Sequence, residues 1–290
     1  MVPLMFAGRD NVMKIFYRPE QTAFGNCDSF SPSAGKPAEV VASWMKQFPA
    51  TELVSFEPLT REDLVLAHDR TYVDAVLDLE RANGFGNRLA AIADTLPFTT
   101  GSFYAAAHHA FTAKESCVSP TSGFHHANYN EGGGFCTFNG LVIAAQKLHR
   151  DEGAKRVGIL DLDCHYGNGT ENIIWRLGLD WIEHYTFGGC GIRQDKSGQW
   201  LKDLTEIVVR FAKCDVVLYQ AGADPHVDDP LGGILTTEQL YERDFIVFKN
   251  LQDLGVPVAW NLAGGYQTPI RKVLDIHDNT ARAFLAVTSS

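Results

Sequence analysis

Asp163, His165 and Asp224 are residues of the types, and at the spacing, that can hold a catalytic metal. Asp163 and His165 are separated by one residue, so in an extended segment their side chains point to the same side. Asp224 follows after enough chain for a helix, a strand and a further helix that returns to the same edge of a sheet. Three such ligands leave a fourth position for water, as in catalytic zinc sites, although Fe(II) or Co(II) would also suit this oxygen-rich set. The alternative is that both aspartates are turn residues that cap helices.

Two pairs of adjacent histidines lie in different sequence contexts. His125 and His126 are flanked by glycine and proline, which indicates an ordered loop where adjacent side chains can reach one cavity. His108 and His109 lie in an alanine-rich run that favours a helix, in which neighbouring positions diverge by about 100°. We therefore expect the loop pair to face a cavity and the helical pair to have surface and packing roles.

Tyr266 follows two glycines, Gly264 and Gly265, after an apolar run. The glycines let the backbone approach a site closely, and a phenol there can donate a hydrogen bond to a developing oxyanion. The alternative is a tyrosine packed on the end of the sheet with its hydroxyl in water. This residue alone does not decide between the two.

The elements that must position these residues can be predicted from the hydrophobic pattern. Short apolar runs alternate with amphipathic helical patterns, which is typical of an α/β fold with a mostly parallel central sheet and helices on both faces. Thr60 and Asp63 resemble a capping box that opens a helix extending through His68. The predicted strands cover residues 12–17, 156–162, 181–186, 215–220 and 258–262. The other predicted helices cover residues 37–48, 139–150, 200–213 and 237–254.

Polar residues directly follow the predicted strands over residues 156–162, 215–220 and 258–262. In open α/β sheets, ligands bind in the crevice beyond the carboxyl ends of the strands. The residues that carry chemistry are therefore expected to meet at one edge of the sheet.

Composition excludes several classes of protein. The 290 residues contain 25 Lys and Arg against 35 Asp and Glu, a net charge of −10 that does not suit direct binding of nucleic acid. No apolar run has the roughly 18 residues of a membrane helix, so no membrane partner is expected. The six cysteines are scattered without a C-x-x-C pair, which favours reduced thiols in the cytoplasm. Because no linker divides the sequence, we expect residues 12–290 to form a single domain. We expect residues 1–11 to be an extra N-terminal segment.

Five motifs, in order, resemble those of the histone deacetylase family, which has the arginase–deacetylase fold. The likeness is closest to the class IV and bacterial histone deacetylase-like amidohydrolases. It runs from about Lys14 to Ala283 and is carried by Gly123-Phe124-His125-His126-Ala127, Gly133-Gly134-Phe135-Cys136, the DLDCHYGNGT segment over residues 161–170, Gly222-Ala223-Asp224 with Leu231-Gly232-Gly233, and Gly264-Gly265-Tyr266-Gln267.

The resemblance implies a role for each matching residue. Its metal ligands would be Asp163, His165 and Asp224, holding one Zn²⁺ in a deacetylase-like catalytic domain. The acid–base pair would be His125 and His126, with Asp161 and Asn168 as their respective hydrogen-bond partners, and Tyr266 would polarise the carbonyl. The substrate channel would be lined by Gly134, Phe135 and Gly264, with Phe187 as the candidate for its opposite aromatic wall. Family members also hold a K⁺ ion, expected here beside Asp161.

Two departures bear on these expectations. Tyr166 stands where the family usually has a second histidine, and its side chain is expected to point away from the metal. The segment 184–199 is shorter than its family counterpart, so the rim of the pocket is expected to differ. A binuclear arginase-type site would need further carboxylates at positions 167 and 226, which are Gly167 and His226, so a single metal is favoured.

The expected activity is zinc-dependent hydrolysis of acetyl or other acyl groups from lysine side chains of proteins or peptides. One alternative is an acetylpolyamine amidohydrolase, which would take an acetylpolyamine substrate but commonly carries a dimerisation insertion that is missing here. Another is a catalytically silent module that binds acyl ligands; the presence of every catalytic residue argues against it.

Overall fold

The computed structural model describes residues 12–23, 29 and 31–289. The expected extra segment, residues 1–11, lies outside the described residues. Within them, seven strands form one sheet in the order β2-β1-β3-β7-β6-β4-β5, and every neighbouring pair is parallel. The predicted α/β architecture is therefore confirmed. The strands are β1 (Met13–Phe16), β2 (Thr51–Val54), β3 (Cys117–Val118), β4 (Val157–Asp161), β5 (Ile182–Thr186), β6 (Val216–Gln220) and β7 (Val258–Asn261).

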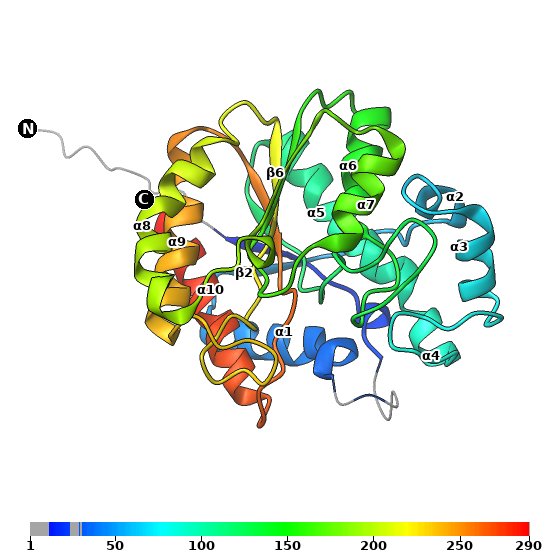
Figure 1. Ribbon diagram of the computed structural model, residues 1–290, viewed down its shortest axis with the longest axis horizontal. Coiled ribbons are helices and arrows are strands. Elements are labelled where there is room, and N and C mark those ends of the chain that lie inside the picture. Colours follow the sequence, from blue (N-terminus) through cyan, green and yellow to red (C-terminus); the bar gives the residue numbers. More distant parts are fainter. Residues whose placement is uncertain (1–11, 24–28, 30, 290) are drawn as a thin grey trace, which may run out of the picture.

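Helices cover both faces of this sheet, as Figure 1 shows. One core lies between the sheet and α1, α8, α9 and α10, and a second lies between the sheet and α3, α5, α6 and α7. The helices are α1 (Lys36–Gln47), α2 (Arg61–Leu64), α3 (Arg70–Leu77), α4 (Ala90–Ala93), α5 (Leu96–Ala113), α6 (Gly140–Asp151), α7 (Asn168–Leu177), α8 (Ser197–Val209), α9 (Thr237–Asp253) and α10 (Arg271–Thr288).

Alternation along the central strands divides their side chains between the two cores. On β4, Ile159 packs on the α5–α6 side and Leu160 on the α9–α10 side. On β6, Leu218 and Tyr219 divide in the same way. All four side chains are fully buried. The central strands therefore read as continuous apolar runs rather than as alternating patterns, because both faces of the sheet are covered.

The predicted helix after Thr60 is shorter than expected. The capping box between Thr60 and Asp63 is present, but α2 ends at Leu64. The chain leaves the helix and buries His68, whose Nδ1 lies 2.9 Å from the carbonyl oxygen of Asn128. The His68 Nε2 accepts the N–H of Asn139 at 2.7 Å. These two contacts bring the segment after α2 against the loop that carries His125 and His126, which we call the loop histidines.

The carboxyl ends of β4, β6 and β7 are aligned in register. Asp161, the last residue of β4, pairs with Gln220 of β6, which pairs in turn with Asn261 of β7. The next amides continue this alignment, since Leu162 donates to Gln220 and Ala221 to Asn261. The three following loops therefore start side by side at one edge of the sheet.

Among the described residues, no helix has both the length and the hydrophobicity needed to cross a membrane.

Candidate metal centre and active site

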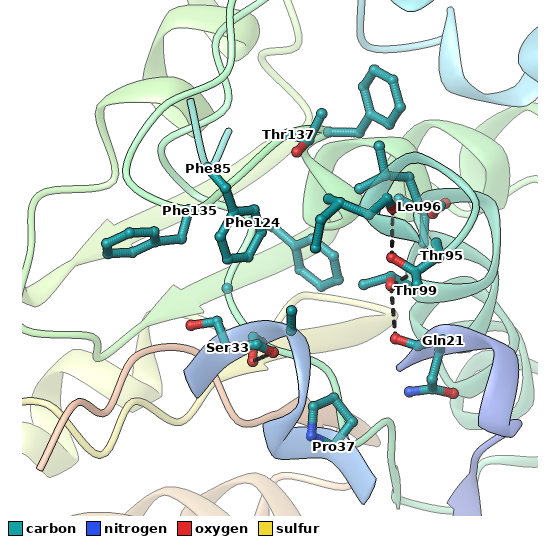
Figure 2. A pocket seen from close by; sticks show the side chains of 16 residues that line it. Gln21, Ser33, Pro37, Phe85, Thr95, Leu96, Thr99, Phe124, Phe135 and Thr137 are labelled. Carbon is teal, nitrogen blue, oxygen red and sulfur yellow. Dashed lines mark hydrogen bonds between the residues drawn. The ribbon is translucent and has the colours of Figure 1, made fainter. Parts of the chain in front are cut away.

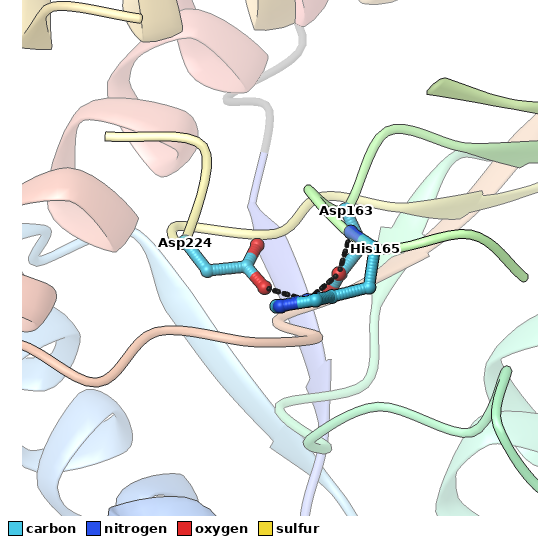
Figure 3. A group of neighbouring side chains, drawn as sticks. All are labelled: Asp163, His165 and Asp224. Carbon is cyan, nitrogen blue, oxygen red and sulfur yellow. Dashed lines mark hydrogen bonds and ion pairs between the residues drawn. The ribbon is translucent and has the colours of Figure 1, made fainter. Parts of the chain in front are cut away.

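Asp163, His165 and Asp224 converge at this edge, as Figure 3 shows. One potential ligand atom from each lies within 4.8 Å of the other two. The Nδ1 of His165 is 3.0 Å from Oδ1 of Asp163 and 3.0 Å from Oδ2 of Asp224. Among the described residues this is the one cluster of three such side chains with metal-ligand spacing.

The backbone fixes one oxygen of each carboxylate. Gly264 N–H donates to Oδ2 of Asp163 at 2.9 Å, and Cys164 N–H donates to Oδ1 of Asp224 at 3.2 Å. Glycine is required at the close approaches: a Cβ on Gly264 would lie 2.2 Å from Oδ2 of Asp224, and one on Gly222 would lie 2.6 Å from its Oδ1. The glycines after β6 and β7 thus allow the two loops to press on the carboxylates.

The donor set and its burial fit a metal ion. Asp163 and Asp224 are buried, and Oδ2 of Asp224 has no hydrogen-bond partner beyond its approach to His165. A buried, unpartnered carboxylate oxygen is costly unless it is paired or coordinated. Two carboxylate oxygens and an imidazole nitrogen are donors that zinc accepts. A divalent cation would therefore satisfy atoms that the protein leaves unsatisfied.

The electrostatics of the three ligands also favour positive charge at this point. Hydrogen bonds to Asp163 and Asp224 raise the pKa of His165 to about 11. Burial, and then the neighbouring charge of Asp163, raise the pKa of Asp224 to about 7. Burial alone would raise the pKa of Asp163 as well, but His125 and His165 lower it well below its ordinary value. The two carboxylates therefore favour positive charge between them, and a divalent cation would supply it.

The loop histidines lie beside this cluster with their rings facing one another. Their ring centroids are 4.1 Å apart. Nδ1 of His125 is 2.6 Å from Oδ2 of Asp161, and Nδ1 of His126 is 2.6 Å from Oδ1 of Asn168. Both pairings match the expectation from the resemblance. A Cβ on Gly134 would lie 2.4 Å from Cδ2 of His126, so this glycine is needed for the ring to fit.

The two histidines differ in charge preference because their partners differ. Burial lowers the pKa of His125, but the carboxylates of Asp161 and Asp163 outweigh it and raise the value to about 9. Burial, and then the positive charge of His125, lower the pKa of His126, whose partner Asn168 is neutral. The pair therefore consists of one imidazole that favours the cation and one that favours the neutral base.

Tyr266 comes to the site on the loop after β7. Its ring centroid lies 5.7 Å from that of Phe135. Burial, followed by the charges of Asp224 and Asp163, raises the pKa of Tyr266 above its ordinary value. Its phenol is therefore kept neutral and able to donate a hydrogen bond. Gly265, with a φ of 146°, provides the turn that leads into it.

Two buried residues that support this loop were missed by the sequence reasoning. Asp229 accepts the backbone N–H of Tyr266 at 2.7 Å and that of Leu231 at 3.0 Å. Lys36, at the start of α1, donates to the carbonyl of Ala263 at 2.5 Å, and burial lowers its pKa to about 8. In the sequence, Asp229 reads as a turn residue before a proline and Lys36 as a surface lysine at a helix start. Neither has a motif signal.

The predicted channel residues divide into those near the site and one that is elsewhere. Gly134 and Phe135 form a turn with successive φ angles of 53° and 66°, which places the Phe135 ring beside Tyr266, and Gly264 lies against Asp224. Phe187, in contrast, is 1% exposed and packs in the core, 4.5 Å from the Trp200 ring. Its side chain belongs to the core between the sheet and α8, α9 and α10, so it presents almost no exposed surface to a channel.

Two further expectations concern neighbouring positions. Tyr166 is 40% exposed, consistent with a side chain that points away from the metal ligands. His226 makes its contacts outside the site, with Nε2 2.9 Å from Thr237 Oγ and Nδ1 accepting the N–H of Asp228. Gly167 has no side chain to offer. A second metal would thus lack ligands at both positions.

Comparisons with known proteins place the chain among deacetylases and amidohydrolases. A family model described as the histone deacetylase domain matches residues 34–178. The chain is 33% identical over 182 residues to an uncharacterized protein of Picosynechococcus sp., covering 56% of this chain and 59% of that protein. It is 27% identical over 266 residues to histone deacetylase 2 of Arabidopsis thaliana, covering 80% and 68%. It is 27% identical over 300 residues to acetylpolyamine amidohydrolase 1 of Pseudomonas aeruginosa, covering 79% and 85%.

The fold is shared with a solved structure. The crystal structure of the HDA15 HD domain matches with a TM-score of 0.78 and 20% identity, covering 97% of this chain and 90% of that one. The chain spans 59% of the length of the Picosynechococcus relative. Because the matching family model covers half of the sequence and includes His125, His126, Asp163 and His165, this protein belongs to the histone deacetylase family.

Proposed function

We propose that this protein is a zinc-dependent amidohydrolase that removes acetyl or other acyl groups from lysine side chains of proteins or peptides. The observation that carries the proposal is the asymmetric histidine pair beside the Asp163, His165 and Asp224 cluster. A site that only bound acyl groups would not need one histidine with a raised pKa and another with a lowered pKa. Pairs of titratable groups whose surroundings move their pKa values apart are typical of acid–base sites.

Asp163, His165 and Asp224 would hold the zinc ion. When bound there, zinc supplies polarisation of the acyl carbonyl and lowers the pKa of the attacking water from 15.7 toward about 7. The remaining chemistry is derived from the side chains of the chain itself.

His126 is the candidate general base. Its Nδ1 faces the amide oxygen of Asn168, which only accepts, so Nδ1 carries the proton and Nε2 keeps its lone pair. Nε2 would take a proton from water and return it to the leaving amine. His125 would stay protonated between Asp161 and Asp163, where its charge would stabilise the negative charge that develops on the oxygens bound to the reacting carbon.

Tyr266 is the candidate donor to the oxyanion. Its neutral phenol can donate as the carbonyl oxygen gains charge, an effect worth about 3–4 kcal/mol at comparable sites. Asp229 holds the backbone of this residue and so orients the phenol. Gly134 and Phe135 would line the path of the lysine side chain.

The metal part of the proposal is tested on the purified protein. Elemental analysis is expected to find one zinc per chain, and zinc added to chelator-treated protein should raise its Tm, since it binds only the folded site. Asp224→Asn should abolish both results. Unchanged zinc content in Asp224→Asn would show that the ion binds elsewhere. The K⁺ ion expected beside Asp161 is tested separately by the dependence of Tm on K⁺ against Na⁺.

The reaction is tested with acetyl-lysine peptides, longer acyl-lysine peptides and acetylpolyamines, with and without a hydroxamate inhibitor. Hydroxamate-sensitive release of acid from the lysine peptides is the expected result. Faster turnover of acetylpolyamines would instead support the second candidate, an acetylpolyamine amidohydrolase. The likeness to the Pseudomonas aeruginosa protein is the observation that favours this candidate. Hydroxamate binding without turnover of any substrate would indicate a binding module.

A further inference from the structure

A buried glutamine lies beneath the loop histidines, and the catalytic steps proposed above do not use it. Gln220 is the last residue of β6 and is fully buried. The register of the sheet places it beside Asp161, the last residue of β4 and the partner of His125. A buried amide finds its hydrogen-bond partners inside the protein, so the contacts of Gln220 indicate what it holds in place.

Both ends of the Gln220 amide make contacts in the site. Nε2 donates to Oδ1 of Asp161 at 3.1 Å, and Oε1 accepts the backbone N–H of Phe124 at 3.3 Å. Only this orientation of the amide fits, because the reverse would set its oxygen against a carboxylate and its NH2 group against an N–H. The N–H of Phe124 therefore orients the amide so that Nε2 faces Asp161.

The two oxygens of the Asp161 carboxylate have different partners. Oδ1 accepts from Gln220 and from the backbone N–H of Asp163, at 3.1 and 3.2 Å. Oδ2 lies 2.6 Å from Nδ1 of His125. The two donors to Oδ1 fix the rotation of the carboxylate, so that Oδ2 is directed at the imidazole. Without Gln220, a single backbone N–H would hold Oδ1, and the carboxylate would be freer to turn.

Phe124, which precedes His125, is held by both its side chain and its backbone. Its ring packs against Phe103 of α5, with 5.3 Å between the ring centroids. Figure 2 shows the same ring across a pocket from Leu96, at the start of that helix. The Phe124 N–H is bound by Gln220. The contacts thus form a closed ring, from the backbone of the histidine loop through Gln220 and Asp161 to the imidazole that follows in the same loop.

We propose that Gln220 is a positioning residue for the reaction, which directs the Asp161 carboxylate at His125. The inference rests on the proposed function, because the direction of His125 matters to turnover only if the site hydrolyses an amide. Gln220 acts through another side chain and is not itself a catalytic residue. The strand β6 would then serve the site twice, through Asp224 in the loop that follows it and through Gln220 at its end.

The first test is kinetic. Gln220→Met keeps the length of the side chain but cannot donate to Asp161. It should lower kcat for acetyl-lysine peptide about tenfold, by analogy with outer partners of metal-ligating histidines, while KM and zinc content stay at the wild-type values. Tyr219→Phe is the matched control, because it removes a buried hydrogen bond to Asp244 from the same strand, on the opposite face of the sheet. It should lower Tm and leave kcat unchanged.

A double-variant cycle separates positioning from a general loss of stability. Gln220→Met added to Asp161→Asn should lower kcat by no more than about twofold further, because the carboxylate through which Gln220 acts is already gone. If the two losses multiplied in full, the inference would be overturned. Gln220→Asn, whose amide is one methylene too short to reach both partners, should show the same pattern with a smaller loss if Gln220→Met does not fold.

The positioning can also be observed without metal or substrate. The short hydrogen bond between His125 and Asp161 should give a low-field proton signal in the ¹H NMR spectrum of chelator-treated protein, and Asp161→Asn should remove it. Gln220→Met should shift or abolish this signal, and Tyr219→Phe should leave it in place. An unchanged signal and an unchanged kcat in Gln220→Met would overturn the inference alone. No turnover of any acyl-lysine by the wild type would overturn the proposed function, and the role of Gln220 in the reaction with it.

Discussion

The chain contains two pairs of adjacent histidines, and the structure places them in opposite surroundings. His108 and His109 lie on α5 at the surface, with 40% and 23% of their side chains exposed. The His108 ring approaches the carboxylate of Glu152, and the His109 ring approaches the carboxylate of Glu115. The other pair lies in the loop before α6, with 3% of the His125 side chain exposed and the two rings facing one another.

The difference comes from the backbone and from the partners. Neighbouring positions on a helix point about 100° apart, so an adjacent pair on α5 cannot reach one cavity. The loop pair is held by contacts from other elements, including Asp161 at the end of β4 and Asn168 at the start of α7. The same dipeptide therefore lies at the surface in one place and in the candidate site in the other.

The strongest test of this comparison is to remove one histidine from each pair. His126→Ala removes the candidate general base and should lower kcat about 10²–10⁴-fold, the usual contribution of acid–base catalysis. Zinc content should not change, because His126 is not a ligand. His109→Ala is the matched control and should leave kcat within twofold of the wild type. Turnover retained by His126→Ala would remove His126 from the mechanism.

A second test removes a charged partner from each pair. Asp161→Asn leaves His125 buried without its carboxylate and should lower kcat about 10–100-fold, by analogy with the range for outer partners of metal-ligating histidines. Glu115→Gln removes the carboxylate that approaches His109 and should leave kcat unchanged. Steady-state kinetics on acetyl-lysine peptide measure both. Equal effects of the two variants would contradict the difference drawn between the pairs.

A third test changes the partner that distinguishes the loop histidines from one another. Asn168→Asp gives His126 a carboxylate, which raises its pKa and keeps it protonated to a higher pH. A protonated base cannot accept a proton, so the acid limb of the kcat profile should move up by about one pH unit, with about tenfold lower kcat below it. Asn172→Asp, on the same helix and exposed, should leave the limb in place. A limb that does not move in Asn168→Asp would exclude His126 as the titrating base.

Much of the fold follows from local pattern, and the exceptions have physical causes. The strand predicted over residues 156–162 extends one residue beyond β4 at each end, and the strand predicted over residues 215–220 begins one residue before β6. Both predictions are close because the two strands are apolar runs buried on two faces. β3 has only two residues, too few for any pattern to show. β2 lies at the edge of the sheet and is partly exposed, so its sequence carries no apolar run.

The site could be predicted as far as motifs reach. Side chains such as Asp163 and His126 belong to a local pattern with recognisable spacing. Asp229 and Lys36 support the loop of Tyr266 through backbone groups, and such contacts depend on three-dimensional proximity rather than on spacing. Phe187 was a candidate only because the resemblance implies a second aromatic wall, and the direction of one side chain depends on a turn that the sequence does not specify.

The smallest expected effect comes from removing the whole surface pair. His108→Ala with His109→Ala breaks one exposed and one partly buried contact, each worth about 0–1 kcal/mol, so the free energy of unfolding from urea melts should fall by no more than about 2 kcal/mol. More of this loss should come from His109, because its ring also lies 5.5 Å from that of Phe16. The single variants separate the two terms. A loss well above this limit would mean that the helical pair stabilises the packing of α5 on the sheet. The two pairs would then both be important, one for stability and the other for the candidate site.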